Sequence, residues 1–243
     1  MNTCELSYLD RVEIDIERAQ RQHEAYTHAL TTMGLDVIEL PAEPDLPDSV
    51  FVEDPAIVLD ELAVMTRPGA ESRRTEGASL AAALARFRPL EQITAPGTLE
   101  GGDVMRVGRT LYVGASARTN REGLAQLTNI LQRFNYEVRA VEVRGCLHLK
   151  SGCTYLGEGI ALANREWVDT SALEGLKIVD VAAEEPFAAN VLTFEGSALM
   201  PEGFPETAKK IGSLGWKLHC VDISELRKAE AGVTCSSLIF RAN

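Results

Sequence analysis

Five polar side chains of chemical interest recur at a nearly constant interval along the chain. They are Asp54, Glu100, His148, Asn190 and Cys235, each at the end of a similar strand-like run. Successive members are separated by 42 to 48 residues. A thiol is a nucleophile, an imidazole carries protons, and carboxylates bind a cation or orient the imidazole. If this interval reflects a structural repeat, Asp54, Glu100, His148 and Cys235 would face a common central pocket.

The sequence around these residues repeats with the same interval. Four stretches combine helical spacing with a following strand-like run, and they cover residues 11–33, 77–87, 120–136 and 205–216. Short β-rich runs fill the gaps, among them residues 35–40, 49–54 and 235–240. Five units of roughly 49 residues each would fit the chain. Because there is no linker, we expect one α/β domain over residues 1–243, a five-fold pseudosymmetric α/β propeller of ββαβ units.

A doubly wound sheet is the competing interpretation of this pattern. It would need longer alternation of strands and helices, and usually a glycine-rich phosphate loop. The sequence contains no G-x-G-x-x-G motif. The repeat interpretation is therefore favoured.

The charge balance restricts the partners. The chain has 24 Lys+Arg against 36 Asp+Glu, a net charge of −12, which disfavours nucleic acid and favours a cationic small molecule. No run of 18 apolar residues is present, so we expect no membrane span. The N-terminus lacks a signal-peptide pattern, and an odd number of cysteines, five, suggests reduced thiols. These features predict a cytoplasmic protein.

Two arginines follow the second strand-like run of successive units. Arg73 lies in GAESRR and Arg118 in GASARTN. Either one alone would be interpreted as a surface ion pair, but their matching places favour a bidentate clamp on a carboxylate. The cluster Cys146, His148 and Cys153 could suggest zinc, yet no second ligand pair follows, so we expect no metal.

Several longer motifs carry a resemblance to a known family. They are DSVFVEDP, TRPGAESRR, APGTLEGGD, GASARTN, LHLKSG and GVTCSSL. From residue 6 onward the chain resembles dimethylarginine dimethylaminohydrolase of the bacterial type, in the guanidine-modifying (pentein) superfamily of five-bladed α/β propellers. The resemblance implies hydrolysis of Nω-methylated L-arginines to citrulline and methylamine or dimethylamine. It implies no cofactor, and it alone suggests a homodimer.

The same resemblance implies catalytic roles for three residues. Cys235 matches the nucleophile, His148 the general acid and base, and Glu100 the acidic partner that orients His148. Since the thiol would share its pocket with carboxylates, we expect its pKa at or above the usual value of ~8.5 until a guanidinium binds.

The resemblance also implies a set of substrate contacts. They are Asp54 and the adjacent Glu53 at the guanidinium, Arg73 and Arg118 at the carboxylate, Asp48 near the α-amino group, Leu6 on a mobile lid, and Ala229, whose carbonyl would face the amino group. Two departures stand out. Ala229 replaces a larger aliphatic residue, and only five residues precede Leu6 where relatives carry a strand. One unit is therefore expected to lack its first strand.

Two other functions remain open at this point. An arginine deiminase-like hydrolase would release ammonia from free arginine, but such chains are usually longer and carry an inserted helical module. A non-catalytic binder of arginine derivatives would be expected to have lost the cysteine or the histidine, and both are present.

Overall fold

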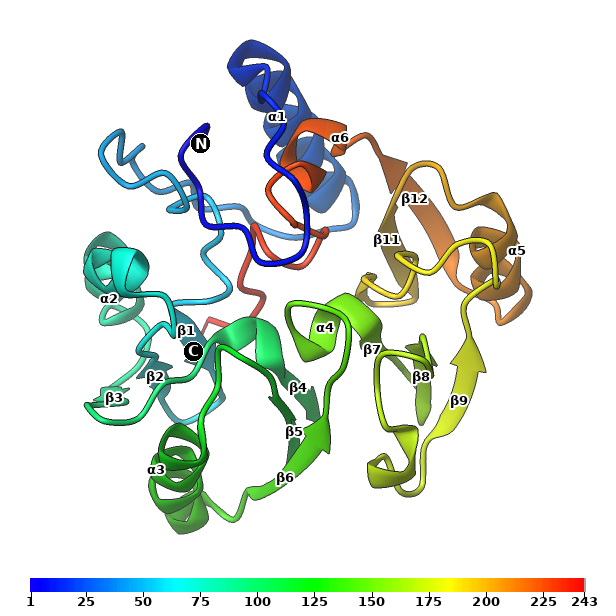
Figure 1. Ribbon diagram of the computed structural model, residues 1–243. Helices are drawn as coiled ribbons and strands as arrows, with labels where there is room; N and C mark the ends of the chain where they lie inside the picture. The colour runs from blue at the N-terminus through cyan, green and yellow to red at the C-terminus, as the bar shows by residue number, and fades with distance from the viewer. Residues whose placement is uncertain (243) are drawn as a thin grey trace.

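The computed structural model describes residues 1–242, whose strands form four three-stranded sheets of the same construction. In each sheet two antiparallel strands form a hairpin, and the third strand pairs parallel with the second. The sheets are β1 (Ala56–Val58), β2 (Ala63–Met65) and β3 (Leu90–Gln92); β4 (Val104–Val107), β5 (Thr110–Ala115) and β6 (Glu137–Glu142); β7 (Cys153–Gly157), β8 (Ile160–Ala163) and β9 (Lys177–Asp180); and β10 (Leu192–Phe194), β11 (Ser197–Pro201) and β12 (Lys217–Val221). Figure 1 shows them arranged around a common centre.

A helix links the second and third strands in three of the four units, as the sequence predicts. These helices are α2 (Ala78–Leu84), α3 (Arg121–Leu131) and α5 (Pro205–Ser213). The Asn120 side chain caps α3 by accepting from the Gly123 N–H at 2.8 Å, and Pro205 occupies the first turn of α5, where no N–H is needed. The third unit has only a short 3₁₀ turn, η4 (Thr170–Ala172), in this place. None of the helices in residues 1–242 is long and apolar enough to cross a membrane.

The remaining sector of the ring contains helices and loops. It holds α1 (Ile16–Thr32), which begins at the capping side chain of Asp15, and α6 (Ser224–Arg227). Helix α1 ends before Gly34, whose φ of 97° is the left-handed conformation that glycine adopts freely at the end of a helix. Residues 1–55 and 222–242 contain no strand, so this sector has no sheet.

Three predicted strands are therefore wrong. In residues 35–40 no neighbouring strand supplies backbone partners, and Ile38 is 60% exposed. Residues 49–54 form tight turns, with the Phe51 N–H bonded to the Asp48 carbonyl and the Asp54 N–H to the Phe51 carbonyl. Residues 235–240 begin with a turn in which the Ser237 N–H bonds to the Thr234 carbonyl. These runs are rich in strand-forming residues, but within residues 1–242 no strand lies beside them to supply backbone hydrogen bonds.

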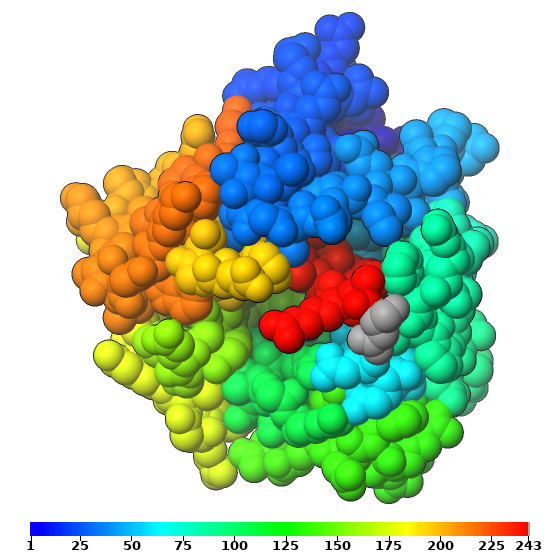
Figure 2. Space-filling view, turned by 180° about the vertical axis from the view of Figure 1, so that it is seen from behind, coloured from blue at the N-terminus to red at the C-terminus, as the bar shows by residue number. Residues whose placement is uncertain are grey.

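The core consists of five apolar clusters, each joining two neighbours in the ring. Three clusters lie between neighbouring sheets: Val64 and Leu111 join the first and second, Met105 and Ala161 the second and third, and Leu162 and Met200 the third and fourth. A fourth cluster, with Tyr26 and Leu199, lies between the fourth sheet and α1. The fifth, with Leu84 and Phe240, lies between the first sheet and the C-terminal segment. Figure 2, viewed from behind, shows this C-terminal segment in red near the middle of the molecule. The clusters thus close the ring.

Candidate active site

A buried carboxylate–imidazole pair lies on two of the loops that lead into the first strand of a unit. His148 Nε2 is 2.7 Å from Glu100 Oε2, and the Glu100 side chain is fully inaccessible. Glu100 directly precedes the 3₁₀ turn η2 (Gly101–Asp103), and His148 caps the short helix α4 (Leu149–Gly152). Both residues therefore precede strands β4 and β7, rather than ending strands as the sequence pattern suggested.

Asp54 brings a third unit to this pair. Its Oδ1 accepts from the Gly102 N–H at 3.1 Å and lies 3.9 Å from His148 Nδ1. Its Oδ2 accepts from Arg73 Nη1 at 2.8 Å. The approach requires glycine at position 102, because a Cβ there would lie 2.6 Å from His148 Nδ1 and 2.8 Å from Asp54 Oδ1. Three residues spaced by the repeat thus converge.

Charge controls protonation in this cluster. Burial lowers the pKa of His148, but the Asp54 charge and the Glu100 hydrogen bond outweigh it and raise that pKa to about 9. Burial likewise opposes ionisation of Asp54, yet the charges of His148 and Arg73 lower its pKa below the usual value. An imidazolium between carboxylates is therefore the resting state near neutral pH.

Cys235 lies in the C-terminal segment and is partly buried. Its Sγ accepts from the Gly232 N–H at 3.3 Å, and its carbonyl accepts from the Glu53 N–H at 3.1 Å. Burial, followed by the charges of Glu53 and Asp54, raises the pKa of the thiol to about 12. Within residues 1–242 no hydrogen bond joins this thiol to His148. The thiol is therefore neutral at rest, in the direction expected from the sequence.

Both arginines predicted to bind a carboxylate are buried beside Asp54 and Glu100, which we call the acidic cluster. Arg73 bridges two carboxylates, bonding to Asp54 and donating through Nε to Glu76 at 3.0 Å. Arg118 Nη1 lies 3.7 Å from Glu100 Oε1, and its Nη2 donates to Ser7 Oγ at 2.9 Å. Their joint hold on a substrate carboxylate stays a prediction.

The other predicted contacts lie around the same centre. Leu6 and Ala229 pack in the apolar cluster that also includes Cys235. Asp48 is buried and its Oδ2 accepts from the Glu5 N–H at 3.1 Å. Burial raises the pKa of Asp48, because the Arg73 charge offsets it only in part.

Asp54, Glu100 and His148 could also hold a metal ion by geometry, with one ligand atom of each within 4.8 Å of the others. In the structure these atoms bond to one another, to Arg73 and to Gly102. The cysteines Cys146 and Cys153 do not join them: their thiols contact the His148 carbonyl and the Met105 sulfur.

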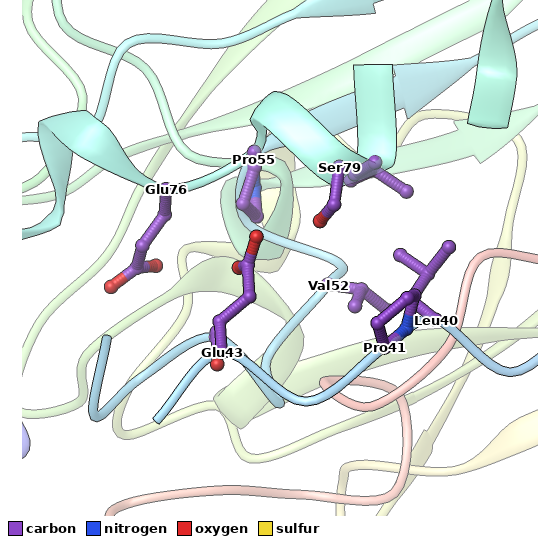
Figure 3. A pocket seen from close by; sticks show the side chains of 10 residues that line it. Leu40, Pro41, Glu43, Val52, Pro55, Glu76 and Ser79 are labelled. Atoms are coloured by element: carbon purple, nitrogen blue, oxygen red, sulfur yellow. The ribbon is translucent and has the colours of Figure 1, made fainter. Parts of the chain in front are cut away.

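A small pocket is lined in part by Glu76. It holds only about 20 Å³ and is lined by Leu40, Val52 and Pro55, among others (Figure 3). Ligand sites for drug-sized molecules are usually about 300–1,000 Å³, so this pocket suits a water molecule rather than an amino acid. Its connection to the acidic cluster runs through Glu76 and Arg73.

Comparisons with known proteins show the family to which the chain belongs. The family model described as N,N dimethylarginine dimethylhydrolase, eukaryotic, matches residues 2–197. The dimethylarginine dimethylaminohydrolase of Pseudomonas aeruginosa is 43% identical over 93% of this chain and 90% of its own length, and that of Streptomyces coelicolor is 39% identical over 97% and 91%. The chain belongs to the dimethylarginine dimethylaminohydrolase family. The resemblance seen in the motifs is confirmed.

A solved structure extends the likeness to three dimensions. A cysteine-to-serine mutant of the Pseudomonas aeruginosa dimethylarginine dimethylaminohydrolase, in complex with citrulline, superposes with a TM-score of 0.90 at 40% identity. It covers 97% of this chain and 93% of that chain. The family fold therefore includes the sector in which this chain has no sheet.

In this dimethylarginine dimethylaminohydrolase family member, sequence reasoning missed a polar network behind the thiol. Glu53 binds Lys150 Nζ at 2.5 Å and accepts from Thr234 Oγ1 at 2.8 Å. Asn190 donates to the Lys150 carbonyl at 2.8 Å and to Thr234 Oγ1 at 3.0 Å. The signal was present in the sequence. Asn190 has the repeat interval, Thr234 directly precedes Cys235, and Lys150 lies two residues after His148.

Proposed function

We propose that this protein hydrolyses Nω-methylated L-arginines to L-citrulline and dimethylamine or methylamine. The observation that carries the proposal is the buried Glu100–His148 pair beside Asp54, in a chain 43% identical to a dimethylarginine dimethylaminohydrolase. An acid–base residue, a guanidinium acceptor and a thiol are the groups that this chemistry needs.

Substrate binding is proposed to use the cluster's carboxylates and arginines. Asp54 accepts guanidinium N–H groups of the substrate, and its hydrogen bond from the Arg73 guanidinium supports this role. Glu53 lies beside it, Arg118 and Arg73 bind the α-carboxylate, and Asp48 and the Ala229 carbonyl bind the α-amino group. Leu6 covers the bound molecule.

The chemistry then proceeds in two halves. The guanidinium charge favours the thiolate of Cys235, whose proton passes to solvent, and the sulfur attacks the guanidinium carbon. His148 gives its proton to the departing amine as the C–N bond breaks, leaving a covalent thiouronium. The neutral imidazole, held by Glu100, then removes a proton from water, which attacks the same carbon, breaks the C–S bond and releases citrulline.

Three further properties belong to this proposal. We propose that residues 1–243 form one domain and that the α1–α6 sector is the fifth unit of a pseudosymmetric ring, supported by the five apolar clusters. The free cysteines support a reducing, cytosolic location. The homodimer implied by the motifs stays a prediction.

An amine-release assay tests the function directly. Asymmetric dimethylarginine should yield dimethylamine and citrulline, whereas Cys235→Ser should yield neither and still bind the substrate. Ammonia from free arginine, without amine from dimethylarginine, would support the deiminase-like alternative. No product from either substrate would support a non-catalytic binder and overturn the proposal.

A further inference from the structure

The N-terminal segment of residues 5–9, which we call the strap, is held by one carboxylate from the other end of the chain. Glu230 Oε1 accepts from three consecutive backbone N–H groups, those of Ser7 at 2.9 Å, Tyr8 at 2.5 Å and Leu9 at 2.7 Å. The other carboxylate oxygen accepts from the Ser7 N–H at 3.1 Å. Hydrogen bonds from N–H groups to an ionised acceptor are stronger than those to a neutral one. Figure 1 shows the strap, in dark blue, beside the segment that follows α6.

The backbone at Glu230 indicates that the side chain is kept for a reason. Its φ is +61°, a left-handed conformation that glycine adopts freely and other residues disfavour. Glu195 is also left-handed, at φ +44°, but it is exposed at the turn between β10 and β11. Glu230 instead directs its carboxylate to the strap, and these bonds offset its unfavourable conformation.

The strap touches the candidate site from two sides. Ser7 Oγ accepts from Arg118 Nη2 at 2.9 Å, and the Glu5 N–H donates to Asp48 Oδ2 at 3.1 Å. Between these two contacts Leu6 packs in the cluster that includes Cys235. Glu230 itself directly follows Ala229, so one carboxylate connects the strap to a neighbour of the site.

We infer that Glu230 is a positioning residue, which fixes the strap so that Leu6, Asp48 and Arg118 are held in the geometry that binds substrate. The inference rests on the proposed function for its substrate, a methylated arginine. Glu230 touches no reacting atom, so its loss should weaken binding while the chemical step, carried by Cys235 and His148, continues.

Glu230→Gly removes the carboxylate that holds the strap. Because glycine adopts the left-handed conformation freely, the substitution adds no backbone strain, and any effect is due to the lost carboxylate. We expect KM for dimethylarginine to rise roughly 10- to 100-fold, with kcat within about threefold of the wild type. Glu230→Gln keeps the shape and one acceptor oxygen without the charge, and should lie between the two. The matched control is Glu195→Gly, which relieves the same kind of strain away from the strap and should leave KM unchanged.

Amide hydrogen exchange provides a readout that needs no substrate. In the free protein, the amides of Ser7, Tyr8 and Leu9 should exchange roughly 10-fold faster in Glu230→Gly than in the wild type, and at the wild-type rate in Glu195→Gly. Unchanged exchange in Glu230→Gly, or a fall in kcat at unchanged KM, would overturn the inference. If wild-type protein releases no amine, the proposed function fails separately. The amide exchange rates of Ser7, Tyr8 and Leu9 then decide by themselves whether Glu230 holds the strap.

Discussion

His148 is positively charged at neutral pH because three carboxylates, those of Asp54, Glu100 and Asp103, outweigh the cost of burying it. Its pKa in the fold is about 9, against an ordinary value of 6.5. Since the folded value is the higher one, the ion pair contributes its full stability below pH 6.5, and this contribution is lost as the pH rises through about 9. For Cys235, burial and then the charges of Glu53 and Asp54 raise the pKa of the thiol and so disfavour the thiolate. The acid is therefore ready before substrate binds, and the nucleophile is not.

Replacing Glu100 tests this account of His148. Glu100→Gln keeps a hydrogen-bond acceptor but removes a charge, and so should lower the pKa of His148. A pH profile of kcat, followed by citrulline formation, should fall above about pH 9 in the wild type and at a lower pH in the variant. A descending limb that stays in place or moves to higher pH would contradict the role of Glu100.

Among the elements, the turn η2 organises the site more than any strand does. Its Asp103 accepts from the Leu149 N–H at 3.0 Å, which joins η2 to α4 and so sets His148 in place. The other oxygen of Asp103 accepts from Ser116 and Thr119, on either side of Arg118. Gly102 in the same turn leaves room for His148 and Asp54 to approach. A three-residue turn thus connects loops from three units.

Gly102→Ala should damage catalysis through position alone. A Cβ would lie 2.6 Å from His148 Nδ1, so the ring or Asp54 has to move, and a displacement of ~1 Å can lower kcat/KM by roughly 100-fold. Gly212→Ala in α5 is the matched control: its Cβ would meet only Leu218, at 3.5 Å, and should raise the free energy of unfolding by about 0.5–1 kcal/mol. Steady-state kinetics and urea unfolding on both variants check this, and near-normal kinetics for Gly102→Ala would argue against a tightly packed site.

For the whole molecule, stability depends on closing the ring. The C-terminal segment performs the closure against the first unit: Phe240 stacks edge-on to Phe87 with centroids 5.5 Å apart, and Arg88 Nη2 donates to the Arg241 carbonyl at 2.5 Å. The same segment carries Cys235, so the nucleophile's place depends on this closure. The packing of the C-terminal segment against the first unit therefore affects both the stability of the molecule and the position of Cys235.

Phe240→Ala should therefore destabilise the molecule and loosen the nucleophile. The Phe240 side chain is partly buried, so we expect its truncation to lower the free energy of unfolding by about 1–3 kcal/mol, with a lower kcat. Ile38→Ala, which truncates a side chain that is 60% exposed, should change stability by less than about 0.5 kcal/mol. Equal unfolding midpoints for the two variants in urea would show that the C-terminal segment does not close the ring.

The sequence by itself determined which residues could form the site. The interval between Asp54, Glu100, His148 and Cys235 predicted their convergence, because units of one construction bring equivalent loops to one axis. The structure brings the first three of them together. It also predicted five units, of which four form sheets, and the helical stretches that contain α1, α2, α3 and α5. Local patterning is sufficient for such elements, since apolar spacing and capping residues act over a few positions.

Only the tertiary structure decided the pairings among those residues. It placed Arg73 on Asp54, Lys150 on Glu53 and Glu230 on the strap, each across a long stretch of sequence. It also left residues 35–40 and 235–240 without strands, although their pattern favoured them. The partner of a buried charge depends on distances and geometry that exist only in the folded ring. A strand forms only where a second strand supplies backbone hydrogen-bond partners. Local sequence determines neither condition.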